Sequence, residues 1–246
     1  MINKKEFIII SGGTSEIGEA IIDELIPNFN IIFTYAKSKI RAERIIAKNK
    51  HQDKILLNKK IDLFSENSIK NFSKYLISKN FHIKGFVHNA WEKVSREDFV
   101  KIKREKLKKM IMSNCFGSFL LTQEITKLMI KNKILDKSIT FISSQAADYG
   151  GNKISPYASS KGFINSLNNS LSKELGKYKI RVNAVTPGKI ITLSMKKNFK
   201  KNFKDVAKDV PLGYLGKPEN VAKIIKNILI NSPYLSGANI KISGGR

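Results

Sequence analysis

The sequence predicts an α/β domain with a doubly wound, seven-stranded parallel sheet and helices on both faces. Short runs rich in Ile, Val and Phe recur along the 246 residues. Their consecutive apolar positions are typical of strands buried between two helical layers. Segments with the helical spacing of apolar residues alternate with these runs. Such alternation indicates βαβ units and therefore a parallel sheet.

The predicted elements follow one another without a linker, an internal repeat or a low-complexity segment, so residues 1–246 are interpreted as a single domain. The expected strands span residues 6–11, 30–36, 54–63, 84–90, 138–144, 180–188 and 238–243. The expected helices span residues 17–27, 40–49, 65–79, 105–132, 155–177 and 218–231. Ligands bind such sheets at the carboxyl ends of the strands, so candidate site residues are sought directly after each strand.

The least regular segment runs over about residues 189–210. A segment of that length in a compact domain is usually a lid or binding loop, or it contains short helices of its own. We expect it to be a substrate loop.

Composition narrows the possible functions. The single cysteine, Cys115, excludes an internal disulfide, and His51, His82 and His88 lack ligand spacing, so we expect no metal site. No run approaches the ~18 to 20 apolar residues of a membrane span, and the N-terminus lacks a signal-peptide pattern. We therefore expect a cytoplasmic protein without membrane contact.

The net charge of +25 raises the question of nucleic-acid binding. Only six of the 45 basic residues are arginine, whereas readers of bases and phosphates rely on the arginine fork. We therefore interpret the charge as a lysine-rich solvated surface and expect no nucleic-acid partner. Recognition of an acidic partner is the alternative, since a positive field speeds encounter with anions.

The first strand runs into "SGGTSEIG", residues 11–18. Glycines let such a turn approach a pyrophosphate, whose charge is favoured by the amides at the following helix N-terminus. The alternative interpretation is an ordinary tight turn between a strand and a helix.

A second motif follows the fifth strand. Ser144 precedes "YASSK", in which Tyr157 and Lys161 have i, i+4 spacing and share one face of a helix. A nearby ammonium favours phenolate and so lowers a tyrosine pKa toward the range useful for proton transfer. The alternative is a plain helix start with a surface lysine.

Together these motifs resemble those of the classical short-chain dehydrogenase/reductase family, and the resemblance extends from the first strand to the C-terminus. The further motifs that carry it are "IDL" (61–63), "HNA" (88–90), "SNCFGSF" (113–119), "ISS" (142–144), "NAVTPG" (183–188), "GKPENVA" (216–222) and "LSGANIKISGG" (235–245). The resemblance implies a Rossmann-type fold and an NAD(P)-dependent oxidoreductase. It places cofactor motifs mainly in residues 7–115 and catalytic and substrate residues in 138–246.

The resemblance implies four catalytic residues. Tyr157 would protonate the nascent alkoxide during reduction, and Ser144 would polarise the carbonyl. Lys161 would hold the nicotinamide ribose and lower the Tyr157 pKa, while Asn114 would keep a water in the proton relay. The protein would supply placement and electrostatics, and the cofactor the hydride.

The resemblance also assigns cofactor contacts, with Asp62 toward adenine and Thr192 toward the carboxamide. The assigned positions are Gly12, Thr14, Ser15, Ile17, Gly18, Lys37, Asp62, Leu63, Asn89, Ala90, Tyr157, Lys161, Pro187, Gly188, Ile190 and Thr192. No acidic residue occurs in residues 33–39, where NAD-selective proteins bind ribose hydroxyls, and Lys37 suits a 2′-phosphate. NADPH is therefore favoured over NADH, although these lysines are also consistent with simple solvent exposure.

Two positions depart from the family pattern. Glu16 replaces the middle glycine of the turn, and we expect its carboxylate to point to solvent, because an inward carboxylate repels pyrophosphate. The family's "NNAG" reads "HNAW", which puts His88 and Trp91 at its ends. Trp91 is a tentative substrate residue together with Gln145 and Tyr149; the alternative for Trp91 is a core filler.

Within the family, the sequence looks most like 3-oxoacyl-[acyl-carrier-protein] reductases, with the segment 189–210 as substrate loop. An acidic acyl-carrier protein would complement the loop's basic residues, which are Lys189, Lys196, Lys197, Lys200, Lys201, Lys204, Lys208 and, just beyond it, Lys217. The alternatives are an oxidoreductase of a sugar or small polar alcohol, and a catalytically idle binding protein. The resemblance further implies a homodimer or homotetramer, through helices 105–132 and 155–177 and the C-terminal "SGGR".

Overall fold

A computed structural model of the chain describes residues 6–92, 96–193, 195 and 203–246. Its centre is a parallel sheet of seven strands in the order β3-β2-β1-β4-β5-β6-β7. The strands are β1 (Glu6–Ser11), β2 (Asn30–Tyr35), β3 (Leu56–Lys60), β4 (His82–His88), β5 (Lys137–Ile142), β6 (Ile180–Pro187) and β7 (Asn239–Ile242). The predicted fold class is confirmed. The order reverses between β1 and β4, which is where such sheets bind ligands.

Alternate residues of the central strands face opposite helical layers. In β1, Ile8 and Ile10 belong to one buried cluster, whereas Phe7 and Ile9 belong to another on the opposite face. Side chains alternate across a strand, so a strand covered on both faces has to be apolar at consecutive positions. This explains why β1 reads as a continuous apolar run.

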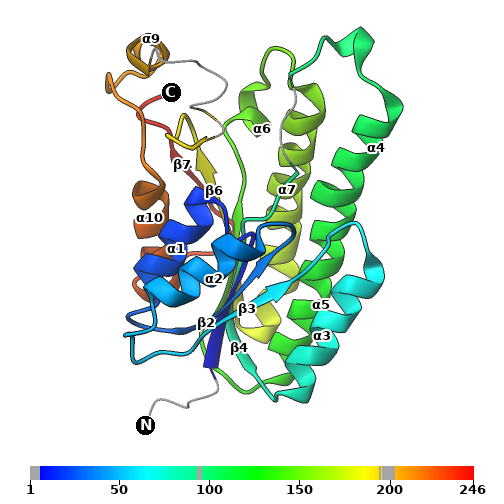
Figure 1. Ribbon diagram of the computed structural model, residues 1–246, viewed down its shortest axis with the longest axis vertical. Coiled ribbons are helices and arrows are strands. Elements are labelled where there is room, and N and C mark those ends of the chain that lie inside the picture. Colours follow the sequence, from blue (N-terminus) through cyan, green and yellow to red (C-terminus); the bar gives the residue numbers. More distant parts are fainter. Residues whose placement is uncertain (1–5, 93–95, 194, 196–202) are drawn as a thin grey trace.

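The helices cover both faces of the sheet, as Figure 1 shows. On one side lie α1 (Glu16–Leu25), α2 (Lys39–Lys48) and α10 (Pro218–Ile230). On the other lie α3 (Glu66–Ser78), α5 (Ser118–Lys131) and α7 (Ser155–Glu174). Among the described helices, none is long and apolar enough to cross a membrane.

The two edge strands differ from the prediction of full burial. β3 is half-buried along most of its length, and β7 alternates between exposed and half-buried residues. Each has only one neighbouring strand, and covering helices do not extend fully over the sheet edges. The sequences of both strands are consistent with this partial exposure, because each contains polar residues: "LLNKK" in β3 and "NIKI" in β7.

The expected long helix over residues 105–132 is interrupted. It consists of α4 (Arg104–Ile111), a π-helical turn (Met112–Gly117) and α5. A π-turn inserts an extra residue into a helix and often occurs at functional sites. The predicted catalytic Asn114 lies in this turn.

Short helices lie close to the carboxyl edge of the sheet. α6 (Ala146–Tyr149) follows β5, a 3₁₀ turn spans Phe99–Lys101, and α9 (Phe203–Lys208) lies inside the segment 189–210. A second 3₁₀ turn, Gly176–Tyr178, lies at the opposite edge, directly before β6. Of the two alternatives for the segment 189–210, the structure shows a short helix; its role as a substrate loop stays a prediction. Its predicted basic residues Lys196, Lys197, Lys200 and Lys201 lie outside the described residues.

Candidate active site

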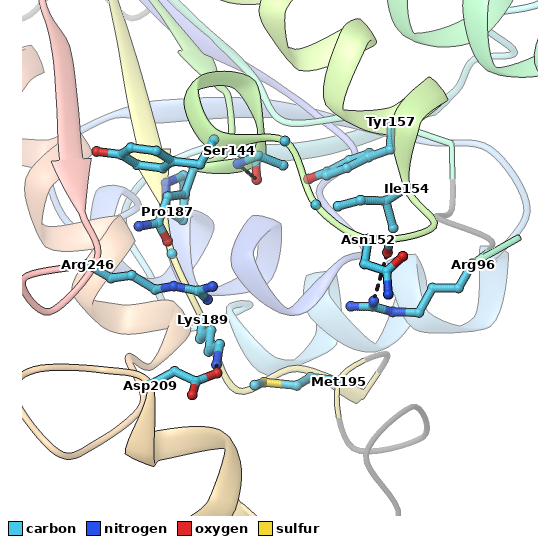
Figure 2. Close-up of a pocket in the computed structure, with 16 residues that line it drawn as sticks. Arg96, Ser144, Asn152, Ile154, Tyr157, Pro187, Lys189, Met195, Asp209 and Arg246 are labelled. Atoms are coloured by element: carbon cyan, nitrogen blue, oxygen red, sulfur yellow. Dashed lines mark hydrogen bonds and ion pairs between the residues drawn. The ribbon is translucent and has the colours of Figure 1, made fainter. Parts of the chain in front are cut away.

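Two hydroxyl groups meet at the carboxyl edge of the sheet. Ser144 comes directly after β5, and Tyr157 lies in the first turn of α7, whose start is favoured by Pro156. The Ser144 hydroxyl lies close enough to the Tyr157 phenol to lower its pKa. Figure 2 shows both residues at the same cavity. The structure thus brings together a hydrogen-bond donor and a proton-carrying group, as the family resemblance implies.

Lys161 lies one helical turn after Tyr157, on the same face of α7. Its side chain is only 4% exposed, and its Nζ atom is 5.9 Å from the centre of the Tyr157 ring. Nζ donates a hydrogen bond to the carbonyl oxygen of Ile142, at the end of β5, over 2.7 Å. The predicted i, i+4 pair is therefore confirmed as a buried pair rather than a surface one.

The pKa values at this pair differ from the expectation that Lys161 lowers the pKa of Tyr157. Burial raises the Tyr157 pKa, and the Ser144 hydrogen bond offsets only part of that rise. Burial also lowers the pKa of Lys161 to about 7. Both charged forms lose their hydration inside the protein, and this loss is the largest cause of both shifts. The phenol is consequently held in its protonated form, which is the form a general acid needs.

The side chain of Asn114 ties the π-turn to its surroundings. Its Oδ1 accepts a 2.7 Å hydrogen bond from the backbone amide of Glu92, and its Nδ2 donates to the Ser160 hydroxyl over 3.2 Å. Asn114 therefore joins the segment after β4 to α7. The water contact expected of Asn114 stays a prediction.

His88 organises the end of β4. The Ser11 hydroxyl oxygen accepts the backbone amides of Asn89 and Ala90, both over 3.0 Å, so its own proton is donated to His88 Nδ1. The proton of the ring then resides on Nε2, which donates to Ser118 over 2.8 Å. Burial, and secondarily the Lys161 charge, lower the pKa of His88 to about 3. His88 is a neutral structural histidine beside the catalytic residues.

A large cavity opens in front of Ser144 and Tyr157. Its volume is about 720 Å³, and Gln145, Tyr149, Pro187 and Gly188 also line it, as predicted for substrate and cofactor positions. Trp91 is not among the described residues that line it. Its indole lies instead against the Tyr157 ring, with ring centroids 5.7 Å apart. Trp91 therefore packs against the predicted catalytic phenol rather than into the cavity.

The glycine turn after β1 packs tightly against the end of β4. Gly12 has φ +66°, and a Cβ there would lie 2.8 Å from Ala90 Cα. Asn89 Nδ2 donates to the carbonyl of Gly12 and to the Ser15 hydroxyl, which in turn accepts the amide of Gly18 and caps α1. The turn thus presents bare backbone at the N-terminus of α1, at the point where the strand order reverses.

Comparison with known proteins decides the family. Residues 14–246 match the family model described as Enoyl-(Acyl carrier protein) reductase. The chain belongs to the short-chain dehydrogenase/reductase family. Like other members of the family, it is an NAD(P)-binding oxidoreductase that acts on CH–OH and C=O groups.

Relatives within the short-chain dehydrogenases/reductases are named for different substrates. L-rhamnose 1-dehydrogenase (NADP(+)) of Thermoplasma acidophilum is 29% identical over 250 residues, covering 96% of this chain and 94% of that protein. The 3-oxoacyl-[acyl-carrier-protein] reductase of Thermotoga maritima is 33% identical over 187 residues, covering 75% and 74%. A solved short-chain dehydrogenase/reductase from Serratia marcescens matches in fold, with a TM-score of 0.88, 24% identity and coverage of 98% and 97%.

The glycine turn fits the dinucleotide that short-chain dehydrogenases/reductases bind. A pyrophosphate needs close approach to backbone amides at a helix N-terminus, and Gly12 and Gly18 leave no side chain in the way. The buried Oδ1 of Asn89 has no hydrogen-bond partner within the described part of the chain. Ser15 uses both its amide and its hydroxyl inside the turn, so its role there is to hold the turn in shape.

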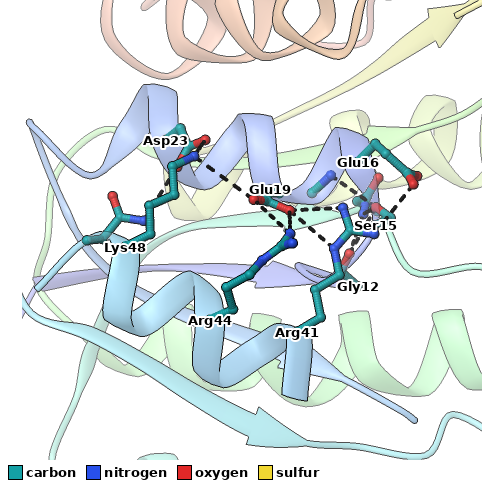
Figure 3. Close-up of polar contacts among 11 residues, drawn as sticks. Gly12, Ser15, Glu16, Glu19, Asp23, Arg41, Arg44 and Lys48 are labelled. Atoms are coloured by element: carbon teal, nitrogen blue, oxygen red, sulfur yellow. Dashed lines mark hydrogen bonds and ion pairs between the residues drawn. The ribbon is translucent and has the colours of Figure 1, made fainter. Parts of the chain in front are cut away.

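Glu16 does not simply point to solvent, contrary to expectation. Its carboxylate lies 3.4 Å from Arg41 Nη1, with both side chains 25% exposed, and Figure 3 shows the pair beside the turn. Arg41 also binds Glu19 over 2.9 Å. Because α2 begins next to the start of α1, Arg41 reaches both carboxylates. Glu16, which replaces the family glycine, thus has its negative charge neutralised by Arg41.

The other predicted cofactor residues lie along the same edge of the sheet. Lys37 is exposed after β2, and Asp62 follows β3, where its Oδ1 accepts the Phe64 amide over 3.0 Å. Thr192 accepts the Met195 amide over 3.2 Å. Thr14 and Ile17 lie in the turn, Leu63 follows Asp62, and Ile190 bridges to Gly216 beyond β6. Their cofactor contacts stay predictions.

Sequence reasoning missed two basic residues of the cavity. Arg96 comes from the segment after β4, and Arg246 from the segment after β7, and both line the space in front of Tyr157. Neither lies in a motif. The sequence offered one indication of a special role: both residues are arginines, and arginine is rare among the basic residues of this chain.

Proposed function

We propose that this protein reduces a ketone to a secondary alcohol with NADPH, and that its substrate is a 3-oxoacyl thioester on an acyl-carrier protein. The observation that carries the reduction is the meeting of the Ser144 and Tyr157 hydroxyls, with a protonated phenol, at the wall of a large cavity. A carbonyl oxygen placed there accepts hydrogen bonds from both hydroxyls. When bound, the reduced nicotinamide supplies the hydride.

The proton moves from the chain's own residues. Ser144 polarises the carbonyl by hydrogen bonding, which stabilises negative charge as it develops on oxygen. Tyr157 then transfers its phenolic proton to that oxygen. Lys161 stabilises the phenolate that results, since its ammonium lies on the same helix face beneath the ring. Lys161 is buried below the cavity wall, whereas Ser144 and Tyr157 are half-buried and reach the substrate from that wall.

The proposed preference for NADPH rests on the end of β2. Residues Lys37, Ser38 and Lys39 are exposed there, and no carboxylate occurs among residues 33–39 to bind the ribose hydroxyls of NAD. The Thermoplasma relative is an NADP(+)-dependent L-rhamnose 1-dehydrogenase. Binding of both cofactors in parallel tests the preference directly.

Positive charge near the cavity supports an acidic carrier protein as partner. This support is weaker than the sequence predicts, because some of the lysines are paired with carboxylates. Lys189 pairs with Asp209 over 2.6 Å, and Lys208 pairs with Asp205 over 2.8 Å. These ion pairs neutralise part of the positive charge that was expected of the loop. Lys204 and Lys217 remain as exposed residues at the same edge. Their contribution would be steering of an acidic partner rather than tight binding.

A sugar or another small polar alcohol is the second candidate. The observation that favours it is the polar lining of the cavity, where Arg96, Asn152 and Arg246 lie in front of the catalytic hydroxyls. Such a lining suits hydroxyl groups better than an acyl chain. The relative with a sugar substrate also covers 96% of this chain.

We further propose that the protein is a homodimer or homotetramer. Exposed apolar side chains follow the outer side of α4, the π-turn and α5: Leu107, Ile111, Phe116 and Phe119. A second copy would bury them. Sedimentation of the wild-type protein and of a Phe119→Lys variant tests this, since only the variant is expected to sediment as a smaller species.

The test of the proposed substrate compares two ketones. Acetoacetyl thioester carried on acyl-carrier protein and a ketose are each incubated with NADPH, and consumption of NADPH is followed. Faster turnover of the carrier-bound thioester is expected. Turnover of the ketose alone would replace the thioester with the second candidate. Binding of NADPH without turnover of either would favour the idle binding protein.

A further inference from the structure

Two guanidinium groups enter the catalytic cavity from opposite walls. Arg96 extends from the segment after β4, and Arg246 extends from the segment after β7, more than half the chain away. Figure 2 shows their side chains directed into the space in front of Ser144 and Tyr157. The amides of Gly188 and Leu212 donate to the carbonyl oxygens of Ile242 and Gly244 over 2.9 and 3.1 Å, which holds the terminal segment beside the cavity.

The charges in the cavity do not cancel. Its described lining contains three cations, Arg96, Lys189 and Arg246, against one carboxylate, Asp209. Lys189 pairs with that carboxylate over 2.6 Å, and this hydrogen bond lowers the pKa of Asp209, with the Arg246 charge as a smaller cause. Arg96 donates to the carbonyl oxygen of Asn152 over 3.3 Å, which orients its guanidinium. The cavity is therefore positive next to the catalytic hydroxyls.

The residue type is informative because lysine is the usual basic residue of this chain. Elsewhere, Arg41 and Arg44 bind Glu19, and Arg181 binds Asp136. Arginine thus occurs here mainly where a planar fork meets an oxyanion. A guanidinium binds phosphate or carboxylate oxygens through two parallel hydrogen bonds, which a lysine ammonium cannot provide.

We propose that the substrate carries a phosphate ester, which Arg96 and Arg246 bind from two sides while the reacting carbonyl lies between Ser144 and Tyr157. Two forks on opposite walls suit the tetrahedral oxygens of a phosphate better than a planar carboxylate. This inference rests on the proposed reduction at that site. The phosphate has two possible sources: the pantetheine arm of an acyl carrier, or a phosphorylated sugar.

The test uses pairs of ketones that differ in phosphate. Acetoacetyl-CoA is compared with the neutral acetoacetyl-N-acetylcysteamine thioester, and fructose 6-phosphate with fructose. For Arg96→Gln and Arg246→Gln, KM is expected to rise about tenfold or more for the phosphate-bearing ketone, as for loss of a charge-assisted hydrogen bond. KM for its neutral counterpart should rise much less, so that each variant changes the ratio of the two KM values. Arg104→Gln, an exposed arginine on α4, is the matched control.

The source of the phosphate is identified by the ketone pair in which the arginine variants raise KM for the phosphate-bearing member. A response of the CoA pair indicates the pantetheine arm, and a response of the fructose pair indicates a sugar phosphate. Equal KM changes for both members of each pair would overturn the proposal, because they would show a general role in the cavity.

A binding measurement separates this inference from the proposed function. Inorganic phosphate is titrated calorimetrically into the NADP⁺-saturated protein, so that the cofactor's own phosphate sites are filled. Weaker binding in both arginine variants supports the phosphate site even when no ketone is reduced. Binding that is equally strong in both variants and in the wild type would overturn it.

Discussion

The indole of Trp91 packs against the phenol ring of Tyr157, with centroids 5.7 Å apart and ring planes tilted by 56°. An aromatic pair in this geometry contributes about 0.5–1.5 kcal/mol beyond the area it buries. The contact covers one side of the phenol ring, whereas another side faces the cavity. The residue that departs from the family's glycine thus acts on the catalytic group itself.

Replacing Trp91 with glycine is expected to change the pH dependence of reduction. Burial raises the pKa of Tyr157, so the opened site of Trp91→Gly lowers it. Reduction needs the protonated phenol, and the rate therefore falls as pH rises through this pKa. The alkaline limb of the kcat/KM profile should move to lower pH. Trp91→Phe keeps a ring and should retain the wild-type profile; identical profiles for all three proteins would contradict the contact's role.

Arg41 is expected to reduce the electrostatic repulsion between the Glu16 carboxylate and the pyrophosphate of a bound cofactor. Their 3.4 Å pair is partly exposed, and such pairs typically contribute 0.2–1 kcal/mol. Arg41→Gln should therefore weaken binding of NADPH and NADH alike, by roughly two- to fivefold. Glu16→Gln should change little, and the double variant should regain most of the loss. Fluorescence titration of both cofactors measures this.

Two results would contradict that account of Glu16. Weaker binding of NADPH alone in Arg41→Gln would place Arg41 at the 2′-phosphate. A large gain in affinity for Glu16→Gln would show that the carboxylate faces the pyrophosphate in spite of Arg41.

Much of the fold follows from local pattern, whereas several site residues do not. The Tyr157–Lys161 pair was predictable because i, i+4 spacing fixes a shared helix face. The partner of Glu16 was not, since Arg41 lies 25 positions away and only the packing of α2 beside α1 brings it near. Arg96 and Arg246 also lie far apart in the sequence, and only the tertiary fold places both at one cavity. The π-turn at Asn114 escaped notice because one inserted residue hardly alters the apolar spacing of a helix.

Protein stability is expected to depend on His88 at acid pH. The pKa of its buried ring is lowered to about 3 from an ordinary 6.5. Between these values the unfolded chain binds a proton that the folded chain does not, so stability present above pH 6.5 is lost as pH falls toward 3. The loss amounts to at most about 1.4 kcal/mol per pH unit for one group.

The comparison with His88→Asn isolates this dependence. The variant loses the hydrogen bond to Ser118 and should be less stable at neutral pH. Urea unfolding at neutral pH and at a pH well below 6.5 should show that the difference from the wild type narrows in acid. A difference that stays constant would mean that His88 is protonated in the folded protein as easily as in the unfolded one.

The most direct test of the whole account is the turnover of Tyr157→Phe with NADPH and whichever ketone the wild type reduces. The variant removes the phenolic proton but keeps the ring that Trp91 and Lys161 contact. We expect turnover to fall by about 10²- to 10⁴-fold with the affinity for NADPH unchanged. A variant that retains turnover close to the wild-type rate would show that the proton comes from another group and that this cavity is not where reduction occurs.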